Sequence, residues 1–169
     1  TDFGDTATPR GLMAGNLNST TRACFSGGYS ESGGNRNTID YITIASTGNS
    51  TDFGDTVGSA YAGGGCSNST RGLIHGPTSG AGNSETIQYI TIASTGNTTD
   101  FGDLTAVSVY GVACASSIRG VMALGMSSGS YSNVLNYVTI GTTGNAQDFG
   151  DLTVARAGLG ATSSAHGGL

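Results

Sequence analysis

The sequence contains no lysine, so its six basic side chains are all arginines, and eleven acidic residues leave a net charge of −5. Proteins bind nucleic acid through clustered positive charge that neutralises phosphates, so this composition argues against a nucleic-acid partner. No apolar run approaches the roughly 20 residues of a membrane-spanning helix, and membrane insertion is not expected. The chain begins without Met and shows no signal peptide, so we expect a processed product or a fragment of a longer chain.

The sequence is rich in glycine, at 30 of 169 residues, and in one repeated pentapeptide. TDFGD, spelled QDFGD in its last copy, occurs four times, at residues 1–5, 51–55, 99–103 and 147–151. Longer stretches recur with it, such as TIDYITIASTGN and TIQYITIASTGN. The repeats predict a single repeat domain of three full units and a partial fourth, at residues 1–50, 51–98, 99–146 and 147–169.

Each unit of about 48 residues lacks an amphipathic helical stripe, which excludes the helical repeat families. Turn-forming Gly and Asn divide the unit into four strand candidates, which in the third unit are residues 104–109, 110–115, 119–125 and 134–139. In TIDYITIA, Ile39 and Tyr41 point to one face of a strand. Ile42 and Ile44 point to the other face, so the predicted sheet is covered on both sides. Such burial is typical of a β-propeller, in which each four-stranded blade packs between two neighbours.

The order of motifs within a unit resembles the blades of kelch-type β-propellers. The first unit reads TPRGLMAG, TRACFSGGY, IDYITI, TGN and DFGD, which matches an arginine-containing strand, a strand ending in Gly-Gly, a strand with Tyr, a turn and an aromatic last strand. Phe53, Phe101 and Phe149 stand where kelch blades commonly place Trp. The resemblance implies an all-β fold of antiparallel four-stranded blades. Propellers have about 4–8 blades, so the ring within this chain would be incomplete, and other copies or the remainder of a longer chain would complete it.

The wording TDFGDLT and YITIASTGN also resembles repeats of tail-fibre and virion proteins from marine, cyanophage-type phages. This resemblance implies a virion or extracellular location, contacts with other virion proteins and a role in host contact.

Two sets of residues are candidates for ligand binding. Arg22, Arg71 and Arg119 share one repeat position. They either hold acidic sugars or line the axial channel, or they are structural and bond to carbonyls or to a DFGD aspartate of the neighbouring blade. Tyr29 and Tyr131 lie in the segments that differ most between units, where an aromatic ring can stack on a sugar or simply be exposed. These segments follow the second strand of each unit, at residues 28–36, 76–84 and 125–133.

No catalytic residue, metal site or cofactor is predicted. DFG occurs four times without HRD or lysine, which excludes a kinase. Asp pairs such as Asp52 and Asp55 are expected to cap turns, and calcium binding is the alternative, although two carboxylates fall short of the 6–8 oxygens that calcium takes. His75 and His166 occupy unrelated repeat positions, so they predict no metal site or catalytic dyad.

The three cysteines, Cys24, Cys66 and Cys114, cannot all pair within one chain because their number is odd. Cys66 and Cys114 share a repeat position, so a bridge between neighbouring units is one reading. Buried free thiols are the other reading.

The leading functional hypothesis is a non-enzymatic structural protein of a virion or extracellular appendage, such as a phage fibre, that adheres to host-surface glycan through many weak contacts. The alternative is a purely structural filament or spacer without a ligand. A third reading is a propeller-type glycan hydrolase, which would need paired carboxylates facing a pocket.

Overall fold

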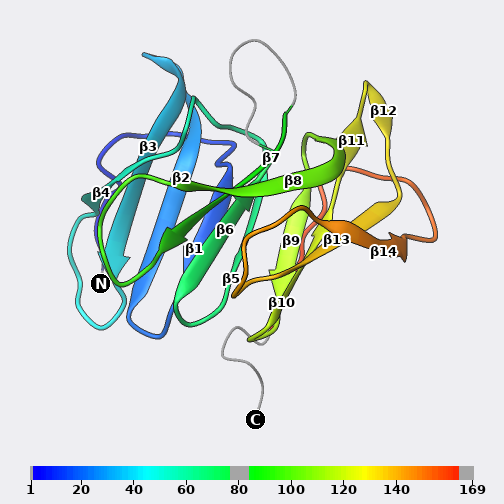
Figure 1. Ribbon diagram of the computed structural model, residues 1–169. Helices are drawn as coiled ribbons and strands as arrows, with labels where there is room; N and C mark the ends of the chain where they lie inside the picture. The colour runs from blue at the N-terminus through cyan, green and yellow to red at the C-terminus, as the bar shows by residue number, and fades with distance from the viewer. Residues whose placement is uncertain (1, 77–83, 164–169) are drawn as a thin grey trace.

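The protein is an all-β structure of three four-stranded antiparallel sheets that follow one another in sequence order (Figure 1). This computed structural model describes residues 2–76 and 84–163. The first sheet consists of β1 (Gly15–Asn18), β2 (Arg22–Ser30), β3 (Gly34–Thr43) and β4 (Thr51–Asp55). The second consists of β5 (Gly64–Ser67), β6 (Arg71–His75), β7 (Ser84–Thr91) and β8 (Thr99–Ser108). The third consists of β9 (Val112–Ala115), β10 (Arg119–Ala123), β13 (Val134–Thr139) and β14 (Gln147–Asp151).

The prediction of four-stranded antiparallel sheets is confirmed, but the sheets do not coincide with the sequence units. The last strand of each sheet contains the pentapeptide that opens the next sequence unit, because that pentapeptide pairs with the strand before it. The strand predicted at 134–139 is present as β13, whereas the one predicted at 104–109 is the second half of β8. The strand predicted at 110–115 starts only at Val112, because Tyr110 adopts a positive φ of 54°.

A small hairpin that the sequence did not predict lies within residues 125–133. It consists of β11 (Met126–Ser127) and β12 (Ser130–Tyr131). Its turn places Ser128 and Gly129 at positive φ, which glycine adopts without steric cost. Among the described residues there is no helix, and hence none long and apolar enough to cross a membrane.

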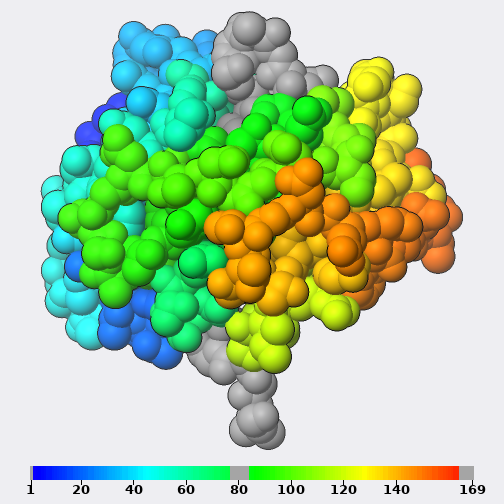
Figure 2. All heavy atoms as spheres, in the orientation of Figure 1, coloured from blue at the N-terminus to red at the C-terminus, as the bar shows by residue number. Residues whose placement is uncertain are grey.

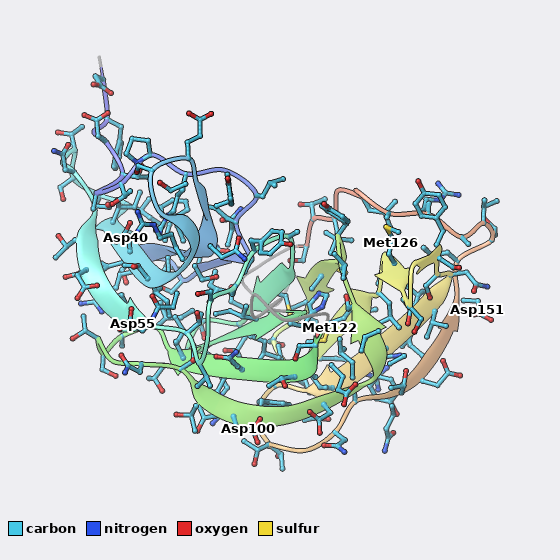
Figure 3. All side chains as sticks on the ribbon, turned by 90° about the horizontal axis from the view of Figure 1, so that it is seen from above. Asp40, Asp55, Asp100, Met122, Met126 and Asp151 are labelled. Carbon is cyan, nitrogen blue, oxygen red and sulfur yellow. The ribbon has the colours of Figure 1, made fainter. Side chains whose placement is uncertain are left out.

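The three sheets fan out from their first strands, β1, β5 and β9, which lie side by side (Figure 1). Ser67 on β5 links two of them, since its hydroxyl donates to the carbonyl of Asn18 at 2.8 Å and accepts from the backbone amide of Asn18 at 3.0 Å. Seen from above, the sheets follow an open arc (Figure 3). The described residues therefore form no closed ring.

The hydrophobic core lies between neighbouring sheets and has two parts. The part between the first and second sheets contains Leu17, Ile39, Phe53, Ile74, Ile90 and Ile92. The part between the second and third sheets contains Leu73, Ile87, Phe101, Met122, Leu124 and Ile140. The second sheet is thus apolar on both faces, with Leu73 and Ile74 pointing in opposite directions along β6. For the first sheet, the prediction that both faces are covered is wrong, because no sheet lies over Ile44, which is 44% exposed in the described structure. Full burial of such side chains contributes about 1.5–3 kcal/mol each.

His75 at the end of β6 is enclosed completely, with 0% of its surface exposed. Its Nδ1 lies 3.4 Å from the hydroxyl of Ser108, and its ring fits because Gly64 and Gly111 carry no side chain that would collide with it. Burial lowers the pKa of His75 to about 4, because a charged imidazolium loses its hydration there.

Acid is predicted to destabilise the protein through His75. The unfolded chain binds a proton at His75 below the ordinary pKa of about 6.5, whereas the folded protein does so only near pH 4. The free energy of unfolding should therefore decrease as the pH falls from 7 to 4, by on the order of 3 kcal/mol. Urea titrations of wild type and His75→Gln would measure this, since carboxylates titrate alike in both. Parallel stability curves for the two proteins would contradict the prediction.

Candidate functional site

The pentapeptide at the edge of one sheet is bonded to a turn of the next sheet, in a contact that we call the junction. At the first junction the carbonyl of Phe53 accepts from the amide of Gly96 at 2.7 Å. The carbonyl of Asp55 accepts from the amide of Thr98 at 2.8 Å. The side-chain oxygen of Asn97 accepts in turn from the amide of Asp55 at 3.0 Å. Three bonds thus join the first sheet to the STGN turn of the second.

The second junction repeats these bonds between the second and third sheets. The carbonyl of Phe101 accepts from the amide of Gly144 at 2.7 Å, and that of Asp103 accepts from the amide of Ala146 at 2.7 Å. The side-chain oxygen of Asn145 accepts from the amide of Asp103 at 3.1 Å. The repeated words TGN and DFGD are therefore the two halves of one recurring contact.

The glycine of the pentapeptide is required by the close approach of two backbones at the junction. Gly54 and Gly102 have φ values of 144° and 141°, which favour glycine. A Cβ atom at either position would also collide with the backbone carbonyl of Gly96 or Gly144. These two constraints explain why the pentapeptide has glycine at this position.

The phenylalanine of the pentapeptide fills the core at each junction. Phe53 and Phe101 are each 2% exposed. They meet Tyr41 and Tyr89 edge to face, with ring centroids 5.9 and 6.0 Å apart, the arrangement that aromatic quadrupoles favour.

The candidate ligand residues Arg22 and Arg71 bond to the neighbouring sheet. The guanidinium of Arg22 lies 4.5 Å from the ring centre of Tyr41 and donates to the carbonyl of Ile92 at 3.0 Å. The guanidinium of Arg71 lies 4.4 Å from the ring centre of Tyr89 and donates to the carbonyl of Ile140 at 2.8 Å. Both arginines therefore connect sheets, as the structural reading of the sequence expected.

The predicted ion pair between these arginines and a DFGD aspartate is wrong. Among the described residues, the ion pair that forms is between Arg10 and Asp40. Arg22 and Arg71 reach backbone carbonyls instead, because the residue that follows the third strand of the neighbouring sheet presents its oxygen to them. The guanidinium of Arg119 lies 4.7 Å from the ring centre of Tyr137. It donates to no carbonyl of a following sheet, because within the described part of the chain no sheet follows the third.

The different surroundings of Arg71 and Arg119 predict different stability losses. Arg71→Ala should lower the free energy of unfolding by about 2 kcal/mol, because it removes a charged hydrogen bond between sheets and a cation–π contact. Arg119→Ala should cost less than about 1 kcal/mol, because only the cation–π contact is lost. Guanidinium titrations of the purified variants, at protein concentrations where each is a single chain, would measure both values. Equal losses would contradict the assignment of Arg71 as a link between sheets.

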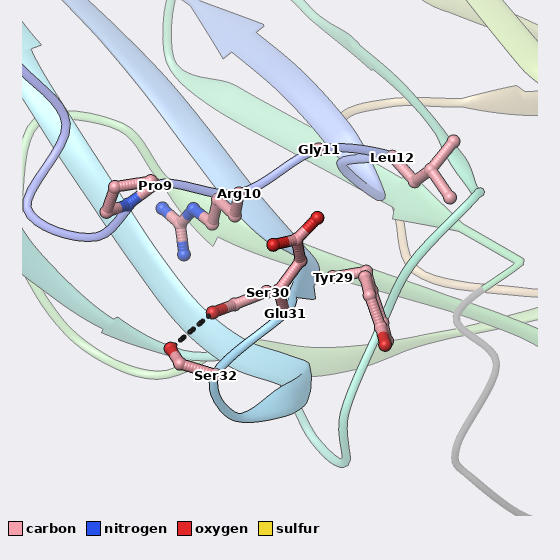
Figure 4. Close-up of a pocket in the computed structure, with 8 residues that line it drawn as sticks. All are labelled: Pro9, Arg10, Gly11, Leu12, Tyr29, Ser30, Glu31 and Ser32. Atoms are coloured by element: carbon pink, nitrogen blue, oxygen red, sulfur yellow. Dashed lines mark hydrogen bonds between the residues drawn. The ribbon is translucent and has the colours of Figure 1, made fainter.

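A hollow of about 540 Å³ opens at the rim of the first sheet, beside Tyr29. Gly11 and Tyr29 exchange two backbone hydrogen bonds of 2.9 and 2.8 Å, which hold the chain before β1 against the end of β2. Figure 4 shows Arg10, Gly11 and Leu12 passing beside Tyr29 and Glu31. Tyr29 is 45% exposed and Leu12 is 57% exposed, so an aromatic and an apolar residue are both accessible there.

The remaining polar groups of the hollow belong to the turn that follows β2. Glu31 contributes an exposed carboxylate. The hydroxyls of Ser30 and Ser32 lie 3.1 Å apart and hydrogen-bond to each other (Figure 4). The hollow therefore combines an aromatic face with hydrogen-bonding oxygens.

The floor of the hollow is fixed by Arg10, whose guanidinium is buried. It pairs with a carboxylate oxygen of Asp40 at 2.6 Å and donates to the carbonyls of Thr38 at 3.0 Å and Phe25 at 3.3 Å. Neither side chain of the ion pair is more than 2% exposed. Arg10 is thus committed to the fold rather than open to a ligand.

Breaking this ion pair is predicted to be costly. Arg10→Leu should lower the free energy of unfolding by about 3–5 kcal/mol, because the carboxylate of Asp40 would remain buried without a partner. Adding Asp40→Asn should recover most of that loss, since the equivalent residues Gln88 and Asn136 are buried amides in sheets without the arginine. Thermal and urea unfolding of the single and double variants would test this. A double variant no more stable than Arg10→Leu would refute the explanation.

The two candidate tyrosines lie on the same rim but in different sheets (Figure 1). Tyr131 on β12 is 66% exposed and does not line the hollow beside Tyr29. The candidate segment 76–84 falls largely on residues 77–83, outside the described residues. Sequence reasoning missed Leu12, whose positive φ of 50° places it beside Tyr29, and the sequence carries no signal for that conformation.

No group of three or more His, Cys, Asp or Glu side chains that could hold a metal ion occurs in residues 2–76 and 84–163. The three cysteines are free, which favours the thiol reading over the bridge. Burial raises the pKa of Cys24 to about 11 and that of Cys66 to about 12, so both are protonated and poor nucleophiles. His166 lies outside the described residues.

Comparison with known proteins provides no family for this chain. No protein-family model matches the sequence, and no curated protein matches it.

Proposed function

We propose that the chain is a set of blades from a kelch-like β-propeller that serves a virion or extracellular appendage as a non-enzymatic adhesion scaffold. The proposal is supported by the combination of identical junctions between the sheets and dissimilar segments on one rim, a common arrangement for recognition surfaces. The observation that carries it is the half-exposed ring of Tyr29, which forms a wall of a hollow of about 540 Å³. Ligand pockets commonly have volumes of about 300–1,000 Å³.

The chemistry of the hollow favours an uncharged sugar as its ligand. A sugar ring presents an apolar C–H face that packs on an aromatic ring such as Tyr29, and hydroxyls that bond to Glu31 and to Ser32. The exposed carboxylate of Glu31 and the net charge of −5 disfavour acidic sugars. Arg10 does not offset this charge at the surface, because Asp40 neutralises it below the hollow. Several such weak contacts on one particle would add through avidity.

A purely structural spacer is the second candidate function. It is favoured by the fact that the most regular features of the chain, the junctions and the arginines Arg22 and Arg71, are used in contacts between sheets. A glycan hydrolase is less well supported. Two-carboxylate mechanisms place a pair of carboxyl groups about 5–9.5 Å apart across the scissile bond, whereas Glu31 is the one carboxylate that lines the hollow.

Glycan binding is predicted to depend on the ring of Tyr29. On an array of neutral glycans, Tyr29→Ala should weaken binding by about tenfold or more, which corresponds to about 1.4 kcal/mol. Tyr29→Phe keeps the aromatic face and should bind nearly as well as wild type. Tyr131→Ala serves as a second control, because Tyr131 lies outside the hollow. Absence of any bound glycan would support the spacer function instead, and binding that survives Tyr29→Ala would place the site elsewhere.

A further inference from the structure

One half of a junction is left open at the end of the third sheet, on a surface that we call the tail face and define by Arg119, Phe149 and Gly150. Phe149 is 49% exposed, whereas Phe53 and Phe101 at the complete junctions are 2% exposed. A Cβ atom at Gly150 would meet nothing within 4 Å, although its φ of 130° is positive like the 141–144° of the other copies of the pentapeptide. Figure 2 shows β14 and the turn before it, in orange, at the surface of the molecule.

Arg119 adds a second open contact to the tail face. It shares its position with Arg22 and Arg71, which donate to a carbonyl of the following sheet. A hollow of about 460 Å³ lies beside it. The equivalent hollow of the second sheet, which has the third sheet as its neighbour, measures about 190 Å³. The tail face thus has the shape and the donors of a junction without the incoming turn.

The first sheet carries the complementary half, which we call the head face and define by Ile44 and the turn of residues 46–50. Ile44 is 44% exposed, although its equivalents Ile92 and Ile140 are at most 1% exposed beneath the preceding sheet. Its carbonyl corresponds to those that accept from Arg22 and Arg71.

The turn of the head face is held by the N-terminal copy of the pentapeptide. The carbonyls of Phe3 and Asp5 accept from the amides of Gly48 and Ser50 at 2.7 and 2.9 Å, and the Asn49 side chain accepts from the amide of Asp5 at 2.9 Å. This segment belongs to no strand and leaves Phe3 39% exposed. The turn is therefore capable of a full junction but holds only a short peptide.

We propose that a second copy of this chain docks head to tail, so that β14 of one copy takes the turn of residues 46–50 of the other and displaces residues 2–5 of that copy. The exchange conserves the two bonds between backbones and the bond to the Asn49 side chain, because both segments contain DFGD. It adds the burial of Phe149 and Ile44 and a bond from Arg119 to the carbonyl of Ile44. The proposal rests on the junctions within the chain and not on the glycan hollow.

Two copies can satisfy every open face, because each copy has one head face and one tail face. Three sheets from each copy would form a ring of six, within the range of about 4–8 blades that closed propellers have. Contacts between unlike faces produce either closed rings or open filaments. The sheets of the single chain follow an open arc (Figure 3). Closure would also cover the outer strands of both ends, which otherwise invite aggregation.

The test measures the mass of the purified chain by native mass spectrometry and sedimentation over a wide range of concentration. Wild type should form a species of about 33 kDa, twice the 16.7 kDa of one chain. Gly150→Val should abolish it, because the added side chain would occupy the space that the carbonyl of Gly48 enters. Arg119→Ala should weaken association by about tenfold and leave the single chain folded. Gly4→Val should strengthen association, since it dislodges the peptide that occupies the turn in the same copy.

Gly102→Val is the matched control, because it disturbs a junction inside one chain. It should lower the melting temperature but leave the tail face unchanged. A measured mass that stays at 16.7 kDa for both wild type and the Gly4→Val variant overturns the proposal. So does a two-copy species that survives both Gly150→Val and Arg119→Ala, or an open-ended series of larger assemblies. None of these outcomes depends on the glycan assay, in which Tyr29 is the probe.

Discussion

The structure depends on the close backbone contact between a glycine-containing pentapeptide and the glycine turn of the following sheet. The strands within a sheet satisfy their own backbone groups, but the sheets themselves need a defined spacing and order. Backbone bonds of 2.7 Å from Gly96 to Phe53 and from Gly144 to Phe101 supply that spacing. They do so without side chains in the gap, so the distance between sheets is set by the backbone and the core packs into it. Small deviations would leave voids or collisions, since interiors are close-packed.

This constraint separates the residues that must recur from those that are free to differ. The glycine and phenylalanine of the pentapeptide, the TGN turn and the arginine over tyrosine all act between sheets. The turn that contains Glu31 and the hairpin that contains Ser128 lie on one rim and make no contact at a junction. A chain can therefore change its rim without changing its assembly, which is the division of labour that a binding scaffold requires.

Much of the fold could be predicted from the sequence because strand periodicity and turn residues are local properties. Val134–Thr139 was placed correctly because turn-forming Gly and Asn residues lie on either side of it. The partner of the pentapeptide could not be predicted, because a backbone bond between Phe53 and Gly96 leaves no mark in either side chain. The arginine pairing failed for the same reason, since the acceptor is a carbonyl that every residue possesses. The Tyr29 hollow was half predicted: the ring was identified, but its neighbour Leu12 depends on a backbone conformation.

The charge pattern inside the sheets shows that one repeat position and the buried residue it faces vary together. Leu12, Ala62, Tyr110 and Gly158 all have positive φ values and mark one repeat position. Two residues earlier the chain has Arg10, Ala60, Ser108 and Arg156. Where arginine stands at Arg10, the sheet buries a carboxylate, Asp40. Where Ala60 and Ser108 stand, it buries neutral amides, Gln88 and Asn136. Because a buried arginine needs a carboxylate to offset its lost hydration, the arginine and the buried carboxylate occur together in the first sheet and are both absent from the second and third.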